Sequence, residues 1–141
     1  MADKMKILVS DDVSEKGVAL LREKGYQVDV KTNLDEVGLI DCIGDYDGLI
    51  TRSMTHVTAD VIAAAKKLKI IGRAGVGIDS IDLKAATARG IIVVNAPTSN
   101  TIAATEHTCA MILAVTRHIP QAHDSLMAGE NSPVFSLKIR P

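Results

Sequence analysis

Short apolar runs alternate with helical patterns along the first hundred or so residues, and this alternation constrains the fold more than any other feature of the chain. Most of the runs are continuously apolar rather than alternating apolar and polar, as expected for strands of a parallel sheet that is covered on both faces. Polar or glycine-containing stretches follow them and end them. The predicted strands are residues 7–9, 28–30, 48–51, 69–71 and 91–94.

Helix start and stop signals stand between the predicted strands. A Ser, Thr, Asp or Asn that precedes an apolar face is expected to be an N-cap, and a glycine after that face is expected to end the helix. Five strand–helix steps of this kind predict an α/β fold with a parallel, doubly wound sheet and right-handed crossovers. The expected N-caps are Ser14, Asn33, Thr58 and Asp82, and the expected terminating glycines are Gly25, Gly44 and Gly90.

The pattern changes after Pro97, where a long helix is predicted from Asn100 or Thr101 to about His118. Pro120 is expected to end this helix, and a shorter helix follows to residues 128–129. The long helix is apolar nearly all round, which is typical of a helix buried between layers, and too little chain follows to bury it. We therefore expect a domain at residues 1–98, the first helices of an incomplete second domain at 99–130, and an atypical tail at 131–141.

Composition and charge exclude several classes of protein. Sixteen basic and seventeen acidic side chains are interspersed and give a net charge of −1, which argues against a nucleic-acid partner or a polybasic membrane surface. The amino terminus lacks the apolar region of a signal peptide, and the most apolar stretch, 109–115, is too short to span a membrane. We expect a cytoplasmic protein, with Cys42 and Cys109 as buried reduced thiols. The histidine and cysteine spacings indicate no metal site.

A glycine-rich loop, GRAGVGID at residues 72–79, directly follows the fourth predicted strand. Gly75 and Gly77 match the first pair of a dinucleotide fingerprint, but Ser80 stands where the third glycine is required, and no suitable acid follows about 20 residues later. We therefore expect the backbone N–H groups of the loop to hold a small anion such as a carboxylate, rather than a pyrophosphate. The alternative interpretation is a plain tight turn.

Thr51-Arg52-Ser53 follows the third predicted strand, on the edge where an open parallel sheet binds its ligands. The guanidinium of Arg52 suits a carboxylate or phosphate, and the hydroxyl of Ser53 adds a donor. The alternative is a surface arginine that pairs with an acidic side chain. Both interpretations stay open from the residues alone.

Four stretches of the chain together resemble the amino-terminal part of the D-isomer-specific 2-hydroxyacid dehydrogenases. The resemblance covers Met5 to Glu130 and is closest to the 3-phosphoglycerate dehydrogenase branch. Its most specific parts are RAGVGID, VVNAP and the pattern N-T-x-A-x-x-E-H. The stretches are KILVSDD, GLITRSMTHVTADVI, KIIGRAGVGIDSIDLKAATARGIIVVNAP and TSNTIAATEHTCAMILAVTRHIPQAHDSLMAGE.

The resemblance implies a fold and a set of site residues. The first hundred or so residues would form a flavodoxin-like substrate-binding domain, and the long helix would begin a separate NAD-binding domain. In this family Arg52 and Ser53 would contact the acid substrate, and the backbone of Gly75, Val76 and Gly77 would receive its carboxylate. Val76 would also lie near the nicotinamide of NAD, and Asn100 would border the cleft.

The resemblance also implies what the chain lacks. The NAD fingerprint and the catalytic arginine, glutamate and histidine of the family lie further along than residue 130. We therefore expect the substrate-binding part of an NAD-dependent dehydrogenase that oxidises 3-phosphoglycerate at its 2-hydroxyl, in serine biosynthesis, or acts on another small 2-hydroxy acid. This part is expected to contain no catalytic residue, to be inactive as an isolated chain, and to form a homo-oligomer through the 101–118 helix.

Two other functions were weighed against this one. The first is a non-catalytic module of the same fold that binds small anions or associates with other subunits. The second is a phospho-receiver domain, because Asp11-Asp12 resembles the metal-binding acids of that class. A receiver also needs an aspartate after the third strand and a lysine after the fifth, where this chain has Thr51-Arg52-Ser53 and Asn95-Ala96-Pro97. The receiver interpretation is therefore disfavoured.

Overall fold

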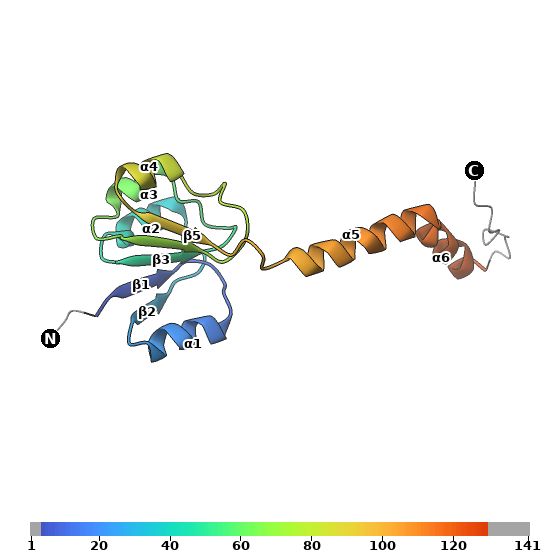
Figure 1. Ribbon diagram of the computed structural model, residues 1–141, viewed down its shortest axis with the longest axis horizontal. Coiled ribbons are helices and arrows are strands. Elements are labelled where there is room, and N and C mark those ends of the chain that lie inside the picture. The colour runs from blue at the N-terminus through green and yellow to red at the C-terminus, as the bar shows by residue number, and fades with distance from the viewer. Residues whose placement is uncertain (1–3, 130–141) are drawn as a thin grey trace. The chain divides into compact units, whose positions relative to one another are not determined.

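The computed structural model describes residues 4–129 and divides the chain into two compact units, Met1–Ser99 and Asn100–Pro141 (Figure 1). The first unit holds a five-stranded, wholly parallel sheet, which confirms the predicted α/β fold. Its spatial order, β2-β1-β3-β4-β5, is that of flavodoxin-like sheets. The strands are β1 (Lys6–Val9), β2 (Gln27–Val30), β3 (Gly48–Thr51), β4 (Ile70–Arg73) and β5 (Ile92–Asn95).

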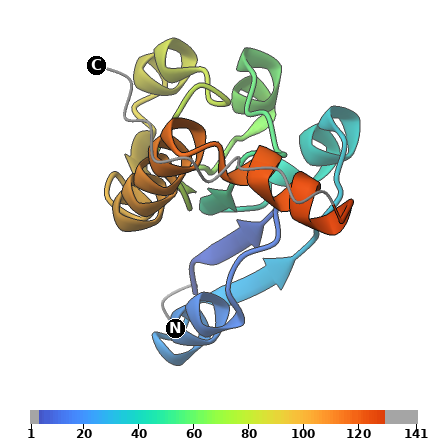
Figure 2. The same cartoon turned by 90° about the vertical axis from the view of Figure 1, so that its right-hand side faces the viewer.

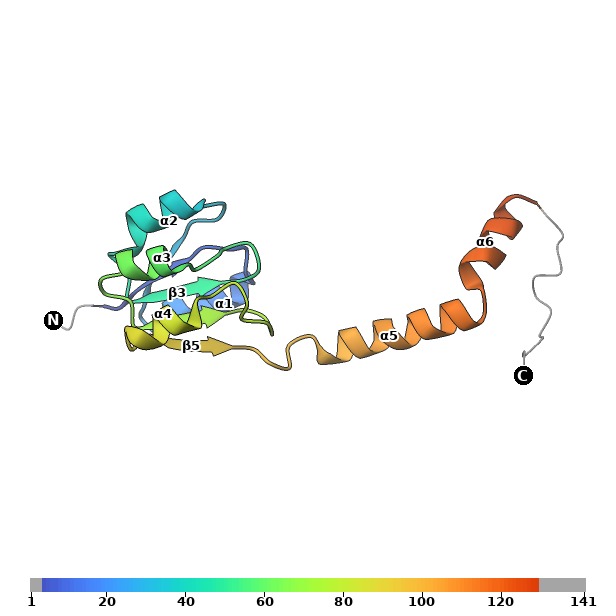
Figure 3. The same cartoon turned by 90° about the horizontal axis from the view of Figure 1, so that it is seen from above.

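Helices connect the strands and cover the two faces of the sheet. They are α1 (Glu15–Glu23), α2 (Glu36–Ile43), α3 (Ala59–Ala64) and α4 (Leu83–Ala88). The first of these lies on one face, and the other three lie side by side on the opposite face (Figures 1 and 3). This arrangement on both faces explains why the strands carry consecutive apolar residues.

The main hydrophobic core lies between the sheet and the three helices α2, α3 and α4. Leu8, Leu49 and Ile71 of the three central strands are at most 1% exposed and form its floor. A smaller core lies on the α1 face, where Ile7 and Val9 pack with Val18 of α1.

The α1 face is covered unevenly. The register of the strands places Ile92 and Val94 of β5 on the same face as Ile7 and Val9 of β1. These two β5 side chains are 61% and 45% exposed, respectively, whereas Ile7 and Val9 are buried. The part of this face formed by β5 is therefore an apolar surface that lies open in the unit.

Three of the four predicted N-caps stand where the sequence places them. The side chain of Thr58 accepts from Val61 N at 3.4 Å, and that of Asp82 accepts from Ala85 N at 2.9 Å. Each of these bonds satisfies one N–H group that the first turn of a helix leaves free. Ser14 precedes α1 but its side chain makes no capping bond.

The prediction that Asn33 caps the second helix is wrong. Asn33 has a φ of 64°, in the left-handed region that asparagine tolerates in turns, and it lies outside the helix. Asp35 is the N-cap instead, with its carboxylate accepting from Gly38 N at 2.8 Å. The turn at Asn33 moves the start of the helix two residues along the chain.

The second unit contains α5 (Thr101–Thr116) and α6 (Ile119–Met127). The chain changes direction at His118, whose φ is 52° (Figure 2). Pro120 therefore does not terminate the long helix as predicted. It lies in the first turn of α6, where a missing N–H costs little. No helix among residues 4–129 is long and apolar enough to cross a membrane.

The side chains of the long helix are largely exposed. No residue of α5 is buried. Cys109 is exposed and Cys42 is half-buried, so the prediction of two buried thiols is wrong. The predicted tail at 131–141 lies outside the described residues, and the assignment of α5 to a cofactor-binding domain stays a prediction.

Candidate functional site

The order of the strands determines where polar side chains can gather. Because β1 pairs with β2 on one side and with β3 on the other, the direction of strand succession reverses between β1 and β3. At such a switch point the loops after the two strands leave toward opposite faces, and ligands bind at this edge. The loop 10–14 after β1 and the turn 52–55 after β3 therefore meet at the expected binding edge.

The carboxylate of Asp11 joins these two loops. It is 5% exposed and accepts hydrogen bonds from the backbone N–H of Arg52 and of Thr55, the latter at 3.2 Å. The hydroxyls of Thr55 and Thr51 lie 2.8 and 3.1 Å from it. From the sequence, Asp11 was expected at the binding edge of the sheet and resembled a receiver acid, but no role was assigned to it. Its signal was a polar Ser-Asp-Asp stretch directly after a buried strand.

The surroundings of Asp11 determine its pKa. Burial of the carboxyl raises its pKa, because the charged form loses water. The hydrogen bonds from the Thr55 side chain, the N–H groups of Arg52 and Thr55, and the Thr51 side chain stabilise the charged form and together outweigh burial. The pKa of Asp11 is therefore lowered from its ordinary value of 3.8.

Arg52 and Ser53 are the first two residues of the 52–55 turn and are exposed. The guanidinium Nη1 of Arg52 donates to the carbonyl oxygen of Asp12 at 3.0 Å. No carboxylate among residues 4–129 forms an ion pair with Arg52, in contrast to the surface-pair interpretation. The hydroxyl of Ser53 has no hydrogen-bond partner within the same residues.

The glycine loop lies beside this turn. Thr51 pairs with Arg73 across β3 and β4, and the N–H of Ala74 donates to the carbonyl of Thr51 at 2.8 Å. The structure therefore brings together the two segments that the sequence analysis singled out, 52–53 and 75–77.

Residues at the end of β5 hold the carbonyl groups of the loop. Ala96 N donates to the carbonyl of Gly75 at 3.0 Å, and Asn95 Nδ2 donates to that of Val76 at 2.7 Å. Within the described part of the chain, nothing accepts from the N–H of Val76 or of Gly77. The carbonyls of Gly75 and Val76 are thus occupied and two consecutive donors are free, which suits an anion.

The backbone conformation of this loop does not itself require glycine. Neither Gly75 nor Gly77 has a positive φ. A Cβ on Gly75 would overlap the Arg73 guanidinium, and a Cβ on Gly77 would lie 3.1 Å from Asp79 Oδ2. The glycines therefore provide space. No signal in the sequence marked Arg73, whose Nε is buried and has no acceptor among the described residues.

The described residues do not fit the pyrophosphate of a dinucleotide. That group needs a helix N-terminus directly after the glycines, whereas α4 begins only at Leu83 and its first turn is already capped by the Asp82 carboxylate. A second negative charge there would be repelled. Asn100 is the N-cap residue of α5 in the second unit, and its predicted place at the cleft stays a prediction. Residues 4–129 hold no cluster of three metal-ligating side chains.

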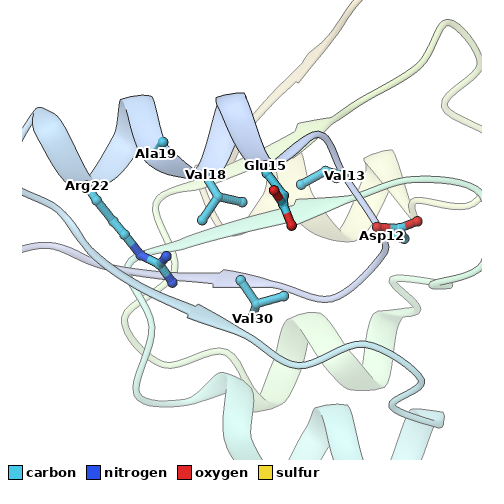
Figure 4. Close-up of a pocket in the computed structure, with 7 residues that line it drawn as sticks. All are labelled: Asp12, Val13, Glu15, Val18, Ala19, Arg22 and Val30. Atoms are coloured by element: carbon cyan, nitrogen blue, oxygen red, sulfur yellow. The ribbon is translucent and has the colours of Figure 1, made fainter.

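A groove of about 450 Å³ lies beside α1, away from the glycine loop (Figure 4). Asp12 lines this groove, and its carbonyl oxygen also accepts a hydrogen bond from Arg52 of the 52–55 turn. Arg22 in this groove already donates to the carbonyl of Val28 at 3.2 Å. The lining residues are Asp12, Val13, Glu15, Val18, Ala19, Arg22 and Val30.

The lowered pKa of Asp11 predicts a pH-dependent part of the stability. A carboxyl whose pKa is lower in the folded protein contributes stability that is fully present above its ordinary pKa, and this is lost as pH falls through the lower, folded value. When the pH is lowered from about 7 to about 3, the free energy of unfolding should therefore fall by less in the Asp11→Asn variant than in the parent chain. Urea unfolding at both pH values measures this.

The comparison isolates Asp11 because the other acids stay in place. The pKa values of Asp29 and Asp47 are also lowered, chiefly by hydrogen bonds from Tyr46 and Lys69 respectively. Their contribution is common to both proteins. Equal losses of free energy in the variant and the parent would contradict the assignment.

Comparison with known proteins agrees with the fold and with the earlier resemblance. A family model, the catalytic domain of D-isomer specific 2-hydroxyacid dehydrogenases, matches residues 7–134. The chain is 53% identical over 121 residues to a D-3-phosphoglycerate dehydrogenase of Synechocystis, which covers 86% of this chain and 22% of that protein. It is 51% identical over 126 residues to the enzyme of that name from Archaeoglobus fulgidus, covering 89% and 24%.

Solved structures show the same fold. A 3-phosphoglycerate dehydrogenase from Entamoeba histolytica with bound NAD⁺ is 32% identical, with a TM-score of 0.72 over 82% of this chain and 40% of that one. A protein from Pyrococcus horikoshii is 30% identical, with a TM-score of 0.80 over 93% and 39%. The chain spans about a quarter of the length of the curated relatives named above. It belongs to the D-isomer specific 2-hydroxyacid dehydrogenase family.

Proposed function

We propose that the Met1–Ser99 unit binds 3-phosphoglycerate as the substrate-binding part of an NAD-dependent D-3-phosphoglycerate dehydrogenase, which oxidises the 2-hydroxyl. The observation that carries the proposal is the pair of free N–H groups at Val76 and Gly77, beside the exposed side chains of Arg52 and Ser53. The names of the relatives support this choice of acid.

Each part of the site has a chemical role in this proposal. The substrate carboxylate accepts from the N–H groups of Val76 and Gly77, and the hydroxyl of Ser53 adds a donor. A guanidinium has five N–H donors, so the single bond of Arg52 to the Asp12 carbonyl leaves others for an anion. Arg73 adds a second positive charge at the same edge. This charge suits a ligand with both a carboxylate and a phosphate.

The described residues supply the acid-binding half of a dehydrogenase site. Hydride transfer also needs NAD held against the substrate carbon and a base within reach of the hydroxyl. The proposal places Val76 beside the nicotinamide and Asn100 at the border of the cleft, and it assigns the catalytic groups to a part of the enzyme outside this chain. The isolated chain is therefore expected to bind the acid without oxidising it.

A second candidate is a non-catalytic module that binds small carboxylates. The two free N–H groups would serve this function equally well, because they recognise any small carboxylate. Incubation of a pure complete protein that contains this chain with NAD⁺ and 3-phosphoglycerate separates the two. Formation of NADH favours the dehydrogenase, and binding of the acid without turnover by that complete protein favours the module.

Arg52→Ala should weaken binding of 3-phosphoglycerate to this chain about tenfold, because a hydrogen bond to a charged group contributes about 1.5–3 kcal/mol. Isothermal titration calorimetry measures the change. Arg22→Ala is the matched control, since Arg22 also donates to one backbone carbonyl, but in the groove beside α1. The Tm of the Arg52 variant should stay close to that of the parent. A large fall in Tm with unchanged affinity would indicate a structural role instead.

Gly77→Val should abolish binding of the acid, because its branched side chain would intrude on the free N–H groups of the loop. The sheet should remain folded, since an added Cβ meets only the end of the Asp79 side chain. Gly17→Val in α1 is a control for side-chain bulk, because nothing lies within 4 Å of a Cβ there. An unchanged affinity for 3-phosphoglycerate in the Gly77 variant would refute this placement of the carboxylate.

We also propose that the chain forms a homo-oligomer through the 101–118 helix. Exposed apolar side chains line α5, and a patch of this kind marks an interface. Two copies would bury these side chains about a two-fold axis. They are Ile102, Met111, Ile112, Leu113 and Val115, each at least 51% exposed.

Sedimentation velocity at micromolar concentration tests this association. The parent chain should sediment as an oligomer, and the double variant Ile112→Glu, Leu113→Glu should shift it toward the monomer, because burial of an apolar group is favourable whereas burial of an unpaired charge is costly. Leu20→Glu, on the exposed side of α1, is the control. A monomeric parent chain would contradict the proposal.

A further inference from the structure

The carboxylate of Asp11 accepts four hydrogen bonds. The hydroxyl of Thr51 and the backbone N–H groups of Arg52 and Thr55 donate to Oδ2, and the hydroxyl of Thr55 lies 2.8 Å from Oδ1. An ionised carboxylate accepts about four hydrogen bonds and donates none. All four donors come from one short segment that follows β3, about forty residues along the chain from Asp11.

These bonds hold the turn at both ends and leave its middle open. Thr51 and Thr55 are buried at 0% and 6% exposure, whereas Met54 between them is 83% exposed. The N–H groups of Ser53 and Met54 have no acceptor among residues 4–129. The turn is therefore held at both ends, and its central residues are exposed to solvent.

The next residue, Asp12, also makes a hydrogen bond with this turn. Its carbonyl oxygen accepts from the guanidinium of Arg52 at 3.0 Å. The loop after β1 thus restrains Arg52 twice, through its backbone N–H at Asp11 and through its side chain at Asp12. Neither restraint uses the exposed hydroxyl of Ser53.

We infer that Asp11 is a positioning residue, which fixes the 52–55 turn so that Arg52 and Ser53 face the acid substrate. The inference rests on the proposed function for its ligand, but it concerns a residue that does not touch that ligand. Asp11 is buried beneath the turn, and its oxygens are occupied by the turn itself. Asparagine is a poor replacement, because it lacks the charge that strengthens these bonds and presents a donor NH₂ group where Asp11 offers only acceptors.

The test compares Asp11→Asn with Asp12→Asn in this chain. Both substitutions remove one negative charge from the same loop, but the Asp12 carboxylate makes no hydrogen bond or ion pair with another described residue. Two quantities are measured for each: amide hydrogen exchange of Arg52 and Thr55 by NMR, and the affinity for 3-phosphoglycerate by calorimetry. Asp11→Asn should speed exchange of both amides and weaken binding, each about tenfold. Asp12→Asn should retain slow exchange.

A second pair of variants keeps the charge of Asp11 and guards against misfolding of Asp11→Asn. Thr55→Val removes the hydroxyl that lies beside Asp11 with little change of volume, and Thr55→Ser restores that hydroxyl. Thr55→Val should speed exchange of the Arg52 amide and weaken binding, and Thr55→Ser should recover both. If the role of Thr55 were merely structural, Thr55→Val would lower the Tm, and Thr55→Ser would not restore the affinity for 3-phosphoglycerate.

The outcomes separate the inference from the proposed function. Unchanged exchange of the Arg52 and Thr55 amides in Asp11→Asn and Thr55→Val overturns the inference, whatever the chain binds. Faster exchange with unchanged affinity also overturns it. A parent chain that exchanges slowly at both amides but does not bind 3-phosphoglycerate overturns the proposed function, and the role of Asp11 in positioning a substrate falls with it.

Discussion

The parallel pairing of β1 with β3 is the constraint on which the rest of the site depends. Because β2 occupies the other side of β1, the chain must cross to the far side of the sheet before it forms β3. The ends of β1, β3 and β4 then lie at one edge, and residues that are far apart in sequence become neighbours. The contact of Asp11 with the 52–55 turn follows from this pairing, and that of Thr51 with Ala74 follows from the neighbouring pairing of β3 with β4.

Some hydrogen-bond donors at this edge are satisfied within the protein, and others are free. The N–H groups of Arg52 and Thr55 point inward and are satisfied by the buried Asp11 carboxylate. The N–H groups of Val76 and Gly77 have no acceptor within residues 4–129 and remain for a ligand. An internal anion thus organises the turn without competing at the surface for the donors that an external anion needs.

Local patterns in the sequence were enough to predict the five strands, the N-caps Thr58 and Asp82, and the segments 52–53 and 75–77 as neighbours at one edge. These depend on periodicity, capping chemistry and the rule for strand ends. The role of Asp11 depends on partners about forty residues away, and the need for glycine at position 75 depends on where the Arg73 side chain lies. The turns at Asn33 and His118 are left-handed conformations of residues other than glycine, which local propensity rarely indicates.

The central claim is that the glycine loop receives the carboxylate of the acid substrate. A crystal structure of this chain with 3-phosphoglycerate tests it most directly. We expect the carboxylate oxygens about 2.9 Å from the backbone nitrogens of Val76 and Gly77, with Arg52 and Ser53 donating to the same ligand. A ligand bound in the groove beside α1, with the N–H groups of the loop facing only water, would contradict it.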